Sequence, residues 1–260
     1  MRLTTIGTGT AAPTPGRVQA GHLVEAGGVR LLLDCGGGVV ARMAELGTAW
    51  QDITHVALTH FHADHTTDLA NLAVAWRYGQ LPPRSAPVTL FGPPGTRALV
   101  ERMAAALWES LTAPGFPFEV REIEPGGPPL PLGDDVTLAA WKVPHTDESV
   151  AYSVERGGRR LVYTGDTAFD PALGGWASSC DVLLCECSLP RAMAVPSHLT
   201  PEECGALAAI ARPRLLALTH LYPPVERVDV RAIVAERFHG PVVIATDGWS
   251  TEIEDRRCWW

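Results

Sequence analysis

The densest group of candidate metal ligands in the sequence is the stretch 59–65 (THFHADH), which holds four of them in six positions. It follows an apolar, strand-like run, and on an extended backbone His60, His62 and Asp64 share one face. A turn into the helix expected next then brings in His65. Neutral imidazoles together with a carboxylate suit Zn²⁺ or a similar transition metal. The stretch predicts a metal site rather than a solvated loop, because the whole chain has only nine histidines.

Three more candidate ligands stand where strand-like runs end, at His145, Asp166 and His220. A rigid scaffold aims side chains at strand ends into a common crevice, where ligands and catalytic groups concentrate. Each has an ordinary explanation when taken alone, as a hydrogen-bonded loop histidine or a simple turn. Their joint placement with the stretch 59–65 favours one shared metal site.

The seven candidate ligands follow the order and spacing of the metal ligands in the metallo-β-lactamase superfamily, which this sequence therefore resembles. The resemblance implies an α/β fold, the four-layer αββα sandwich. It also implies two divalent metal ions, Zn²⁺ in first place and Mn²⁺ as the alternative. One ion would be held by His60, His62 and His145, the other by Asp64, His65 and His220, with Asp166 bridging them.

A closer resemblance, covering essentially the whole chain, is to ribonuclease Z and its phosphodiesterase relatives. It is carried by Gly7-Thr8-Gly9-Thr10, Asp34-Cys35-Gly36-Gly37-Gly38, Phe91-Gly92-Pro93-Pro94-Gly95 and Tyr163-Thr164-Gly165-Asp166-Thr167. In that branch a histidine in an H-x-T setting, supported by an upstream glutamate, lies at the scissile phosphate; generic lactonases and glyoxalase-type thioesterases lack the pair. The resemblance places these roles on His198 and Glu186.

The activity implied is hydrolysis of a small or cyclic phosphodiester by a hydroxide that bridges the two metals. Asp64 is expected to orient the hydroxide and accept its proton. His198, held by Glu186, is expected to stabilise the transition-state oxyanion or to protonate the leaving oxygen.

One departure from ribonuclease Z concerns the arm that this family inserts between the ligands matched by His145 and Asp166. Only twenty residues separate them here, and they predict two adjoining strands and a turn. The formal net charge of −8 also disfavours a grip on folded RNA, which depends largely on phosphate contacts from Lys and Arg. Processing of tRNA 3′ ends is therefore the second candidate activity. A lactonase, thioesterase or β-lactamase-type hydrolase is a further alternative, and a non-catalytic scaffold is disfavoured because every ligand position is filled.

The elements that must position these residues alternate along the chain. Strands are expected at Leu3–Ile6, Val29–Asp34, His55–Thr59, Val88–Phe91, Phe118–Ile123, Val136–Val143, Val150–Val154, Arg160–Thr164, Asp181–Glu186, Leu215–Thr219 and Val242–Thr246. Helices are expected at Val39–Leu46, Thr67–Tyr78, Thr96–Leu111, Pro201–Ala211 and Val228–Phe238, with a Thr200–Glu203 capping box before the fourth and a Gly240 cap after the fifth.

The length and composition suit a chain that buries its own core. Its 260 residues are 46% hydrophobic and 19% charged. We expect residues 1–260 to form a single domain whose two halves meet near 125–135, because Pro125–Asp135 is the only linker-like segment.

The remaining features predict a cytoplasmic protein without a membrane partner. No run approaches the roughly 18 apolar residues of a membrane span. The cysteines show no disulfide framework and are expected to be reduced and buried, with Cys185 and Cys187 on opposite faces of a strand. A homodimer contact is expected at Trp249 and the Trp259-Trp260 pair.

His22 and His55 sit in apolar, strand-like runs. Both are interpreted as structural histidines whose ring nitrogens are hydrogen-bonded.

Overall fold

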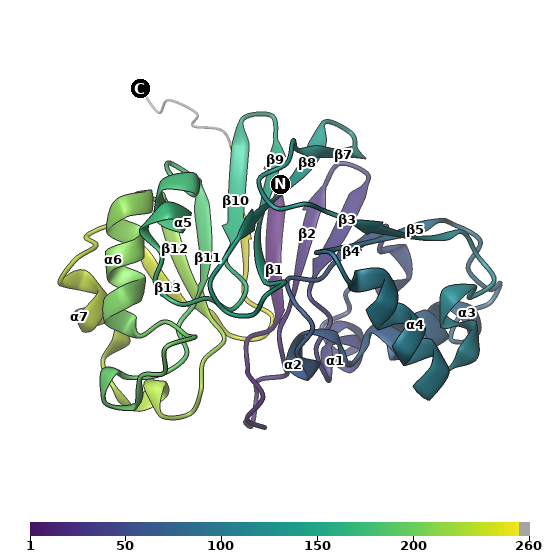
Figure 1. Cartoon of the computed structure of the whole chain (residues 1–260), viewed down its shortest axis with the longest axis horizontal. Helices are drawn as coiled ribbons and strands as arrows, with labels where there is room; N and C mark the ends of the chain where they lie inside the picture. Colours follow the sequence, from purple (N-terminus) through teal and green to yellow (C-terminus); the bar gives the residue numbers. More distant parts are fainter. Residues whose placement is uncertain (255–260) are drawn as a thin grey trace.

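Two seven-stranded sheets pack face to face, and each is covered on its outer side by helices (Figure 1). The computed structural model describes residues 1–254. The chain builds the sheets one after the other, crossing between Glu122 and Leu130, and its last strand returns to the first sheet. The order of layers is helices, sheet, sheet, helices, so the four-layer αββα fold expected from the sequence is confirmed.

The first sheet carries the stretch 59–65 at the end of one of its parallel strands. Its strand order is β14 (Ser250–Glu252), β1 (Arg2–Gly7), β2 (Gly21–Ala26), β3 (Val29–Leu33), β4 (His55–Ala57), β5 (Val88–Gly92) and β6 (Phe118–Glu122). Its helices are α1 (Val39–Glu45), α2 (Ala63–Thr66), α3 (Leu69–Tyr78) and α4 (Thr96–Ala106). Strands β3 to β6 are parallel, so the segments that follow them emerge at the same edge.

The second sheet is antiparallel from β7 to β10 and parallel from β10 to β13. Its strands are β7 (Leu130–Gly133), β8 (Val136–Lys142), β9 (Val150–Arg156), β10 (Arg159–Tyr163), β11 (Val182–Glu186), β12 (Leu215–Thr219) and β13 (Val242–Ile244). Helices α5 (Pro171–Trp176), α6 (Pro201–Ala211) and α7 (Val230–Ala235) cover its outer side (Figure 1).

Three hydrophobic clusters hold the layers together, and consecutive strand residues alternate between them. Leu33 of β3 and Leu184 of β11 face the cluster between the sheets. Their neighbours face outward: Leu32 packs in the cluster with the helices of the first sheet, and Leu183 packs with those of the second. Successive strand side chains point to opposite faces, so a sheet buried on both sides is encoded by a continuous apolar run.

The structure contains three strands and two helices that the sequence patterns do not predict: β2, β7, β14, α2 and α5. Strand β7 lies inside Pro125–Asp135, the segment interpreted as a linker. An edge strand tolerates proline because one side of its backbone is unpaired. Asp134 and Asp135, at φ 48° and 60°, close the hairpin to β8.

Helix α6 has the predicted bounds, and the capping box of Thr200 and Glu203 is present. Most other helices end or begin inside their predicted ranges; α4, for example, stops at Ala106, before a 3-10 turn over Glu109–Thr112. The expected cap at Gly240 is wrong, because α7 ends at Ala235. A Cβ at Gly240 would lie 2.3 Å from the Phe238 ring, so a larger residue there would have to displace that side chain.

The five cysteines within the described residues are free and buried, as expected, and Cys258 lies outside those residues. The expected opposite placement of Cys185 and Cys187 is wrong: both belong to the cluster under α5, α6 and α7. Side chains two positions apart on a strand share a face.

Two further expectations concern the surface. Trp249 packs against the cluster between the sheets, and Trp259 and Trp260 lie outside the described residues. None of the helices within residues 1–254 is both long and apolar enough to cross a membrane.

His22 on β2 is fully buried and lies edge-on to Tyr163, with 4.8 Å between the ring centroids. Neither of its ring nitrogens has a hydrogen-bond partner, so the interpretation of His22 as hydrogen-bonded is wrong. For His55 it is confirmed, because its Nδ1 lies 2.7 Å from Thr54 Oγ1. Burial lowers the pKa of His22 to about 3, which keeps the ring neutral.

We expect His22→Leu to raise the free energy of unfolding under mildly acidic conditions. The unfolded chain binds a proton at this histidine below its ordinary pKa of 6.5, and the folded chain does so only near 3. The free energy of unfolding therefore decreases as the pH falls through this window, with a slope that approaches about 1.4 kcal/mol per pH unit. Urea unfolding at pH 7.5 and 5.5, in excess chelator, measures this loss in wild type and variant. The exposed His239 provides the control His239→Leu. An equal loss in wild type and His22→Leu contradicts the prediction.

Candidate metal centre

The seven candidate ligands come together where the ends of strands from both sheets meet. The first sheet supplies its ligands after β4, and the second supplies them after β8, β10 and β12. The side chains form two groups that could each hold a metal ion: His60, His62, His145 and Asp166 in one, and Asp64, His65 and His220 in the other.

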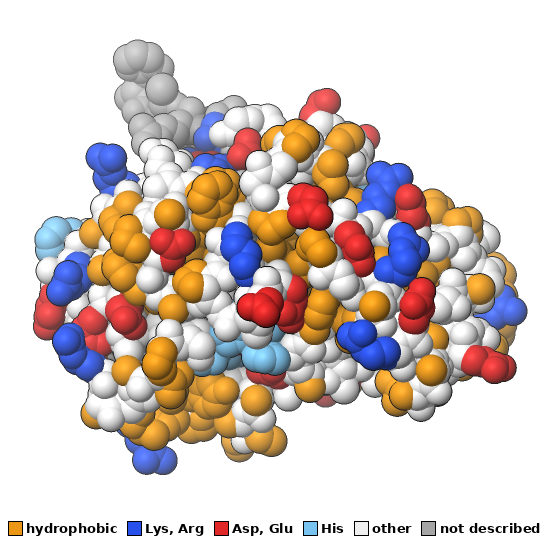
Figure 2. All heavy atoms as spheres, in the orientation of Figure 1, with side chains coloured by type: hydrophobic (Ala, Val, Ile, Leu, Met, Phe, Trp, Pro, Cys, Tyr) orange, Lys and Arg blue, Asp and Glu red, His pale blue; other side chains and the backbone are white. Residues whose placement is uncertain are grey.

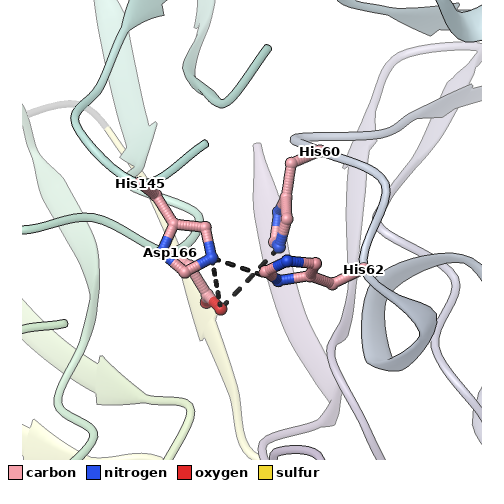
Figure 3. A group of neighbouring side chains, drawn as sticks. All are labelled: His60, His62, His145 and Asp166. Carbon is pink, nitrogen blue, oxygen red and sulfur yellow. Dashed lines mark hydrogen bonds and ion pairs between the residues drawn. The ribbon is translucent and has the colours of Figure 1, made fainter. Parts of the chain in front are cut away.

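The first group surrounds one small space with three imidazoles and one carboxylate (Figure 3). One ligand atom of each residue lies within 4.8 Å of the others. His145 Nε2 lies 3.1 Å from His62 Nδ1, and Asp166 Oδ2 lies 3.9 Å from His60 Nε2 and 3.8 Å from His145 Nε2. Three imidazoles with one carboxylate oxygen make a set suited to a four-coordinate transition metal.

The second group faces the other oxygen of the same carboxylate. Asp166 Oδ1 lies 3.4 Å from His65 Nε2 and 3.4 Å from His220 Nε2. Asp64 Oδ2 lies 3.4 Å from His220 Nε2 and 3.9 Å from His65 Nε2. Each oxygen of Asp166 therefore serves a different group, which is the arrangement that a bridging ligand requires.

Asp64 and His65 reach the second group because the chain turns into a helix earlier than expected. Helix α2 begins at Ala63, directly after His62, whose backbone is still extended. The expectation that Asp64 shares a face with His60 and His62 is therefore wrong. The helical turn directs Asp64 and His65 to a group of their own.

Unpaired buried atoms line the space between the two groups. His60 Nε2, His65 Nε2 and Asp166 Oδ1 have no hydrogen-bond partner within the described residues. Burial lowers the pKa of His60, so its imidazole is neutral, the form that binds metal. Buried polar atoms without partners are costly, and cations held by the two groups would satisfy all three. The donor set therefore fits divalent metal ions.

Asp34, directly after β3, is a site residue that the sequence reasoning missed, and it holds His65 in place. Its carboxylate lies 2.8 Å from His65 Nδ1 and accepts hydrogen bonds from the Tyr163 hydroxyl at 2.8 Å and the Thr59 amide at 2.7 Å. A carboxylate on Nδ1 selects the tautomer whose Nε2 is free for a metal. The available signal is an aspartate at the end of a buried strand, followed by one cysteine and three glycines.

His198 and Glu186 form a hydrogen-bonded pair beside Asp166. His198 Nδ1 lies 3.1 and 3.2 Å from the two Glu186 oxygens and 3.9 Å from Asp166 Oδ2. Burial lowers the pKa of His198, but the hydrogen bond and charge of Glu186, together with the charges of Asp166 and Asp64, outweigh burial, and the net shift of the pKa is upward. Because Nδ1 is engaged by the carboxylate, Nε2 is the nitrogen available to a substrate.

The segment that leads to His198 is fixed to the first group as well. The Ser197 carbonyl oxygen lies 2.9 Å from His145 Nδ1. One short stretch of chain therefore positions His198 and a candidate ligand together, which ties the placement of His198 to the metal centre.

Two cations in segments that adjoin the ligands have partners on the protein. Arg17 Nε lies 2.7 Å from a Glu226 oxygen, and Lys142 Nζ donates to the Thr146 carbonyl at 2.7 Å. Asp147 and Glu148, in the loop after His145, add negative charge beside Lys142. On the face shown in Figure 2, Lys and Arg side chains are scattered among acidic and apolar ones, with no continuous basic field around the pale blue histidines.

Comparison with known sequences finds the same family along most of the chain. Residues 29–221 match a model described as a β-lactamase superfamily domain. Ribonuclease Z of Mycobacterium bovis is 29% identical over 282 residues, which cover 99% of this chain and 100% of that protein. An uncharacterized protein of Mycobacterium leprae is 33% identical over 261 residues, which cover 98% of this chain and 89% of that protein.

Solved structures share the fold. The metallo-β-lactamase fold protein YhfI of Bacillus subtilis aligns with a TM-score of 0.83 at 24% identity, covering 96% of this chain and 98% of that one. The short form of human tRNase Z aligns with a TM-score of 0.80 at 24% identity, covering 98% and 100%. The chain belongs to the metallo-β-lactamase superfamily. It is a metal-dependent hydrolase of the ribonuclease Z-like branch, as its motifs indicate.

Proposed function

We propose that this chain is a phosphodiesterase that uses two metal ions to hydrolyse a small or cyclic phosphodiester. The observation that carries the proposal is the His198–Glu186 pair, 3.1 Å apart and adjacent to Asp166, the carboxylate that faces both ligand groups. This pair puts a proton donor or oxyanion-stabilising group within reach of a phosphoryl group held between the two groups.

The seven candidate ligands are the residues that would hold two divalent cations. Histidine and carboxylate ligands accept both Zn²⁺ and Mn²⁺, with Zn²⁺ the first choice because imidazole nitrogen suits it well. When bound, such ions supply Lewis acidity and a strong nucleophile at neutral pH, and they neutralise charge on the phosphoryl group.

Two side chains of this protein carry the proton transfers in the proposal, and a third positions one of them. Asp64 orients the attacking water and accepts its proton. His198 donates a proton through Nε2 to the oxygen that leaves, or stabilises the charge that develops on the phosphoryl oxygens. Glu186 holds His198 in position through Nδ1.

The charges in the segments that adjoin the ligands favour a small substrate. Binding of folded RNA draws most of its affinity from cations that neutralise phosphates. Here Arg17 is paired with Glu226, and Lys142 lies beside Asp147 and Glu148. The second candidate is a tRNA 3′-processing endoribonuclease, which the 29% identity to ribonuclease Z of Mycobacterium bovis favours.

A substrate panel separates these activities. We expect kcat/KM of the zinc-loaded protein to be highest for cyclic nucleotides or bis(p-nitrophenyl) phosphate, lower for a precursor tRNA, and lowest for a lactone and a thioester. Asp166→Asn, which alters the carboxylate that faces both ligand groups, is purified in parallel and controls for contaminating hydrolases. Preferred cleavage of precursor tRNA, with a steep loss of activity as salt increases, would establish the second candidate. Preferred hydrolysis of the lactone or thioester would overturn both.

The proposal also covers organisation and location. We infer that residues 1–260 act as a single catalytic domain in the cytoplasm, where the buried free cysteines remain reduced. The aromatic pair Trp259-Trp260 supports a homodimer, and light scattering decides between the 27.9 kDa mass of one chain and twice that value.

A further inference from the structure

A second set of contacts links Glu186 to the metal centre through Ser188, a residue with no role in the proposed reaction so far. Glu186 and Ser188 are both fully buried. Ser188 Oγ donates to Glu186 Oε2 at 2.5 Å, and it lies 3.0 Å from His220 Nδ1. The hydroxyl thus stands between the carboxylate that holds His198 and the imidazole of a candidate ligand.

The single proton of the hydroxyl fixes the direction of these hydrogen bonds. Its possible acceptors are the Glu186 carboxylate at 2.5 Å, His220 Nδ1 at 3.0 Å, the His220 carbonyl at 3.3 Å and His198 Nδ1 at 3.4 Å. The carboxylate is closest and charged, and charge-assisted hydrogen bonds are the stronger ones. Since the proton goes to Glu186, the oxygen of Ser188 accepts from His220 Nδ1.

This direction determines which nitrogen of His220 can bind a metal. With the proton on Nδ1, the lone pair is on Nε2, the atom 3.4 Å from both Asp64 Oδ2 and Asp166 Oδ1. Ser188 therefore does for His220 what Asp34 does for His65. Unlike Asp34, Ser188 also donates a hydrogen bond to Glu186, the carboxylate that holds His198.

We propose that Ser188 is a positioning residue that couples the second ligand group to the His198–Glu186 pair. Metal binding at Asp64, His65 and His220 then favours the hydrogen-bonded arrangement of Ser188 and Glu186 that holds His198. By linkage, the same arrangement raises the affinity of these ligands for metal. The inference uses the ligand assignment of the proposed function, but it predicts metal affinity and therefore does not depend on the substrate.

The remaining partners of Glu186 indicate what Ser188→Ala removes. Glu186 also accepts from the amides of Thr167 at 2.5 Å and Leu199 at 3.2 Å, so its carboxylate stays satisfied in the variant. His220 Nδ1 loses the acceptor on which its tautomer depends. Removing the hydrogen-bond partner of a metal ligand typically lowers metal affinity about 10–100-fold.

The test is a double-mutant cycle read out as Zn²⁺ affinity, measured by competition with a chromogenic chelator. We expect Ser188→Ala to weaken the more weakly bound zinc equivalent by about 10–100-fold. Glu186→Gln should weaken it less, and the double variant should bind no more weakly than Ser188→Ala, since both changes break one chain of contacts. The visible absorption of the Co²⁺-loaded protein should change in Ser188→Ala and be restored in Ser188→Thr, which keeps the hydroxyl.

Ser153→Ala is the matched control, because Ser153 is a buried, hydrogen-bonded serine in β9 of the same sheet, away from the ligands. It should bind zinc as the wild type does, and thermal unfolding confirms that each variant is folded. Unchanged zinc affinity in folded Ser188→Ala, or strictly additive losses in the double variant, overturns the coupling. If the zinc affinities of the single and double variants change as expected while no phosphodiester is hydrolysed, the proposed function fails and the coupling stands.

Discussion

Replacing His198 with alanine is expected to lower kcat for a phosphodiester by about 10²–10⁴-fold, the usual contribution of a general acid or base. At saturating zinc, two ions per chain should remain bound, because neither ligand group proposed for the two ions needs this histidine. Elemental analysis and steady-state kinetics on the same preparation measure both quantities.

The leaving group shows whether His198 acts as an acid. Nitrophenolate leaves without a proton, whereas an alkoxide needs one, so His198→Ala should harm an alkyl diester far more than a nitrophenyl diester. Equal losses would assign His198 to charge stabilisation rather than proton transfer. An undiminished rate with both substrates would remove His198 from the mechanism.

Replacing Asp166 with asparagine is expected to reduce bound metal from two ions per chain to one or fewer. Its two oxygens face different ligand groups at 3.4–3.9 Å, so this single change weakens both groups at once. Loss of the transition-state stabilisation that the ions supply should lower hydrolysis by roughly 10³-fold or more.

Asp181→Asn is the matched control for Asp166→Asn. Asp181 is also a buried carboxylate of the second sheet, but it pairs with Arg214 at 2.8 Å and contacts none of the candidate ligands. Elemental analysis after dialysis against zinc without chelator should find two ions per chain in this control. Two ions retained in Asp166→Asn would contradict its role as the bridging ligand.

The candidate ligands were predictable because their positions follow from local rules. The stretch 59–65 is continuous in sequence, and the other three ligands follow strand-like runs, whose ends a sheet brings to one edge. The buried runs that predict β3, β4, β11 and β12 are equally local, since strands covered on both faces are apolar throughout.

The residues that orient the ligands were not predictable in the same way. Asp34 touches the Tyr163 hydroxyl across 129 positions of sequence, and Ser188 touches His220 across 32. The Asp34 contact exists only once the two sheets have packed, and the Ser188 contact only once β11 and β12 have paired in the second sheet. Asp34 has a local signal in its position at the end of a buried strand, but nothing in the residue types distinguishes Ser188 from a turn residue. Strand β7 escaped prediction for a related reason: its pairing with β8 overrides a composition typical of a loop.

Each ligand group draws side chains from both sheets: His60 and His62 with His145 in one, and His65 with His220 in the other. A bound ion would therefore cross-link distant parts of the chain. Ligands that bind only the folded form add to its stability, by about 2.7 kcal/mol at a concentration of 100 times Kd. A chain made during metal starvation would lack both cross-links and expose more of itself to proteases. Metal supply would then govern the lifetime of the protein in the cell, and its abundance would rise and fall with that supply.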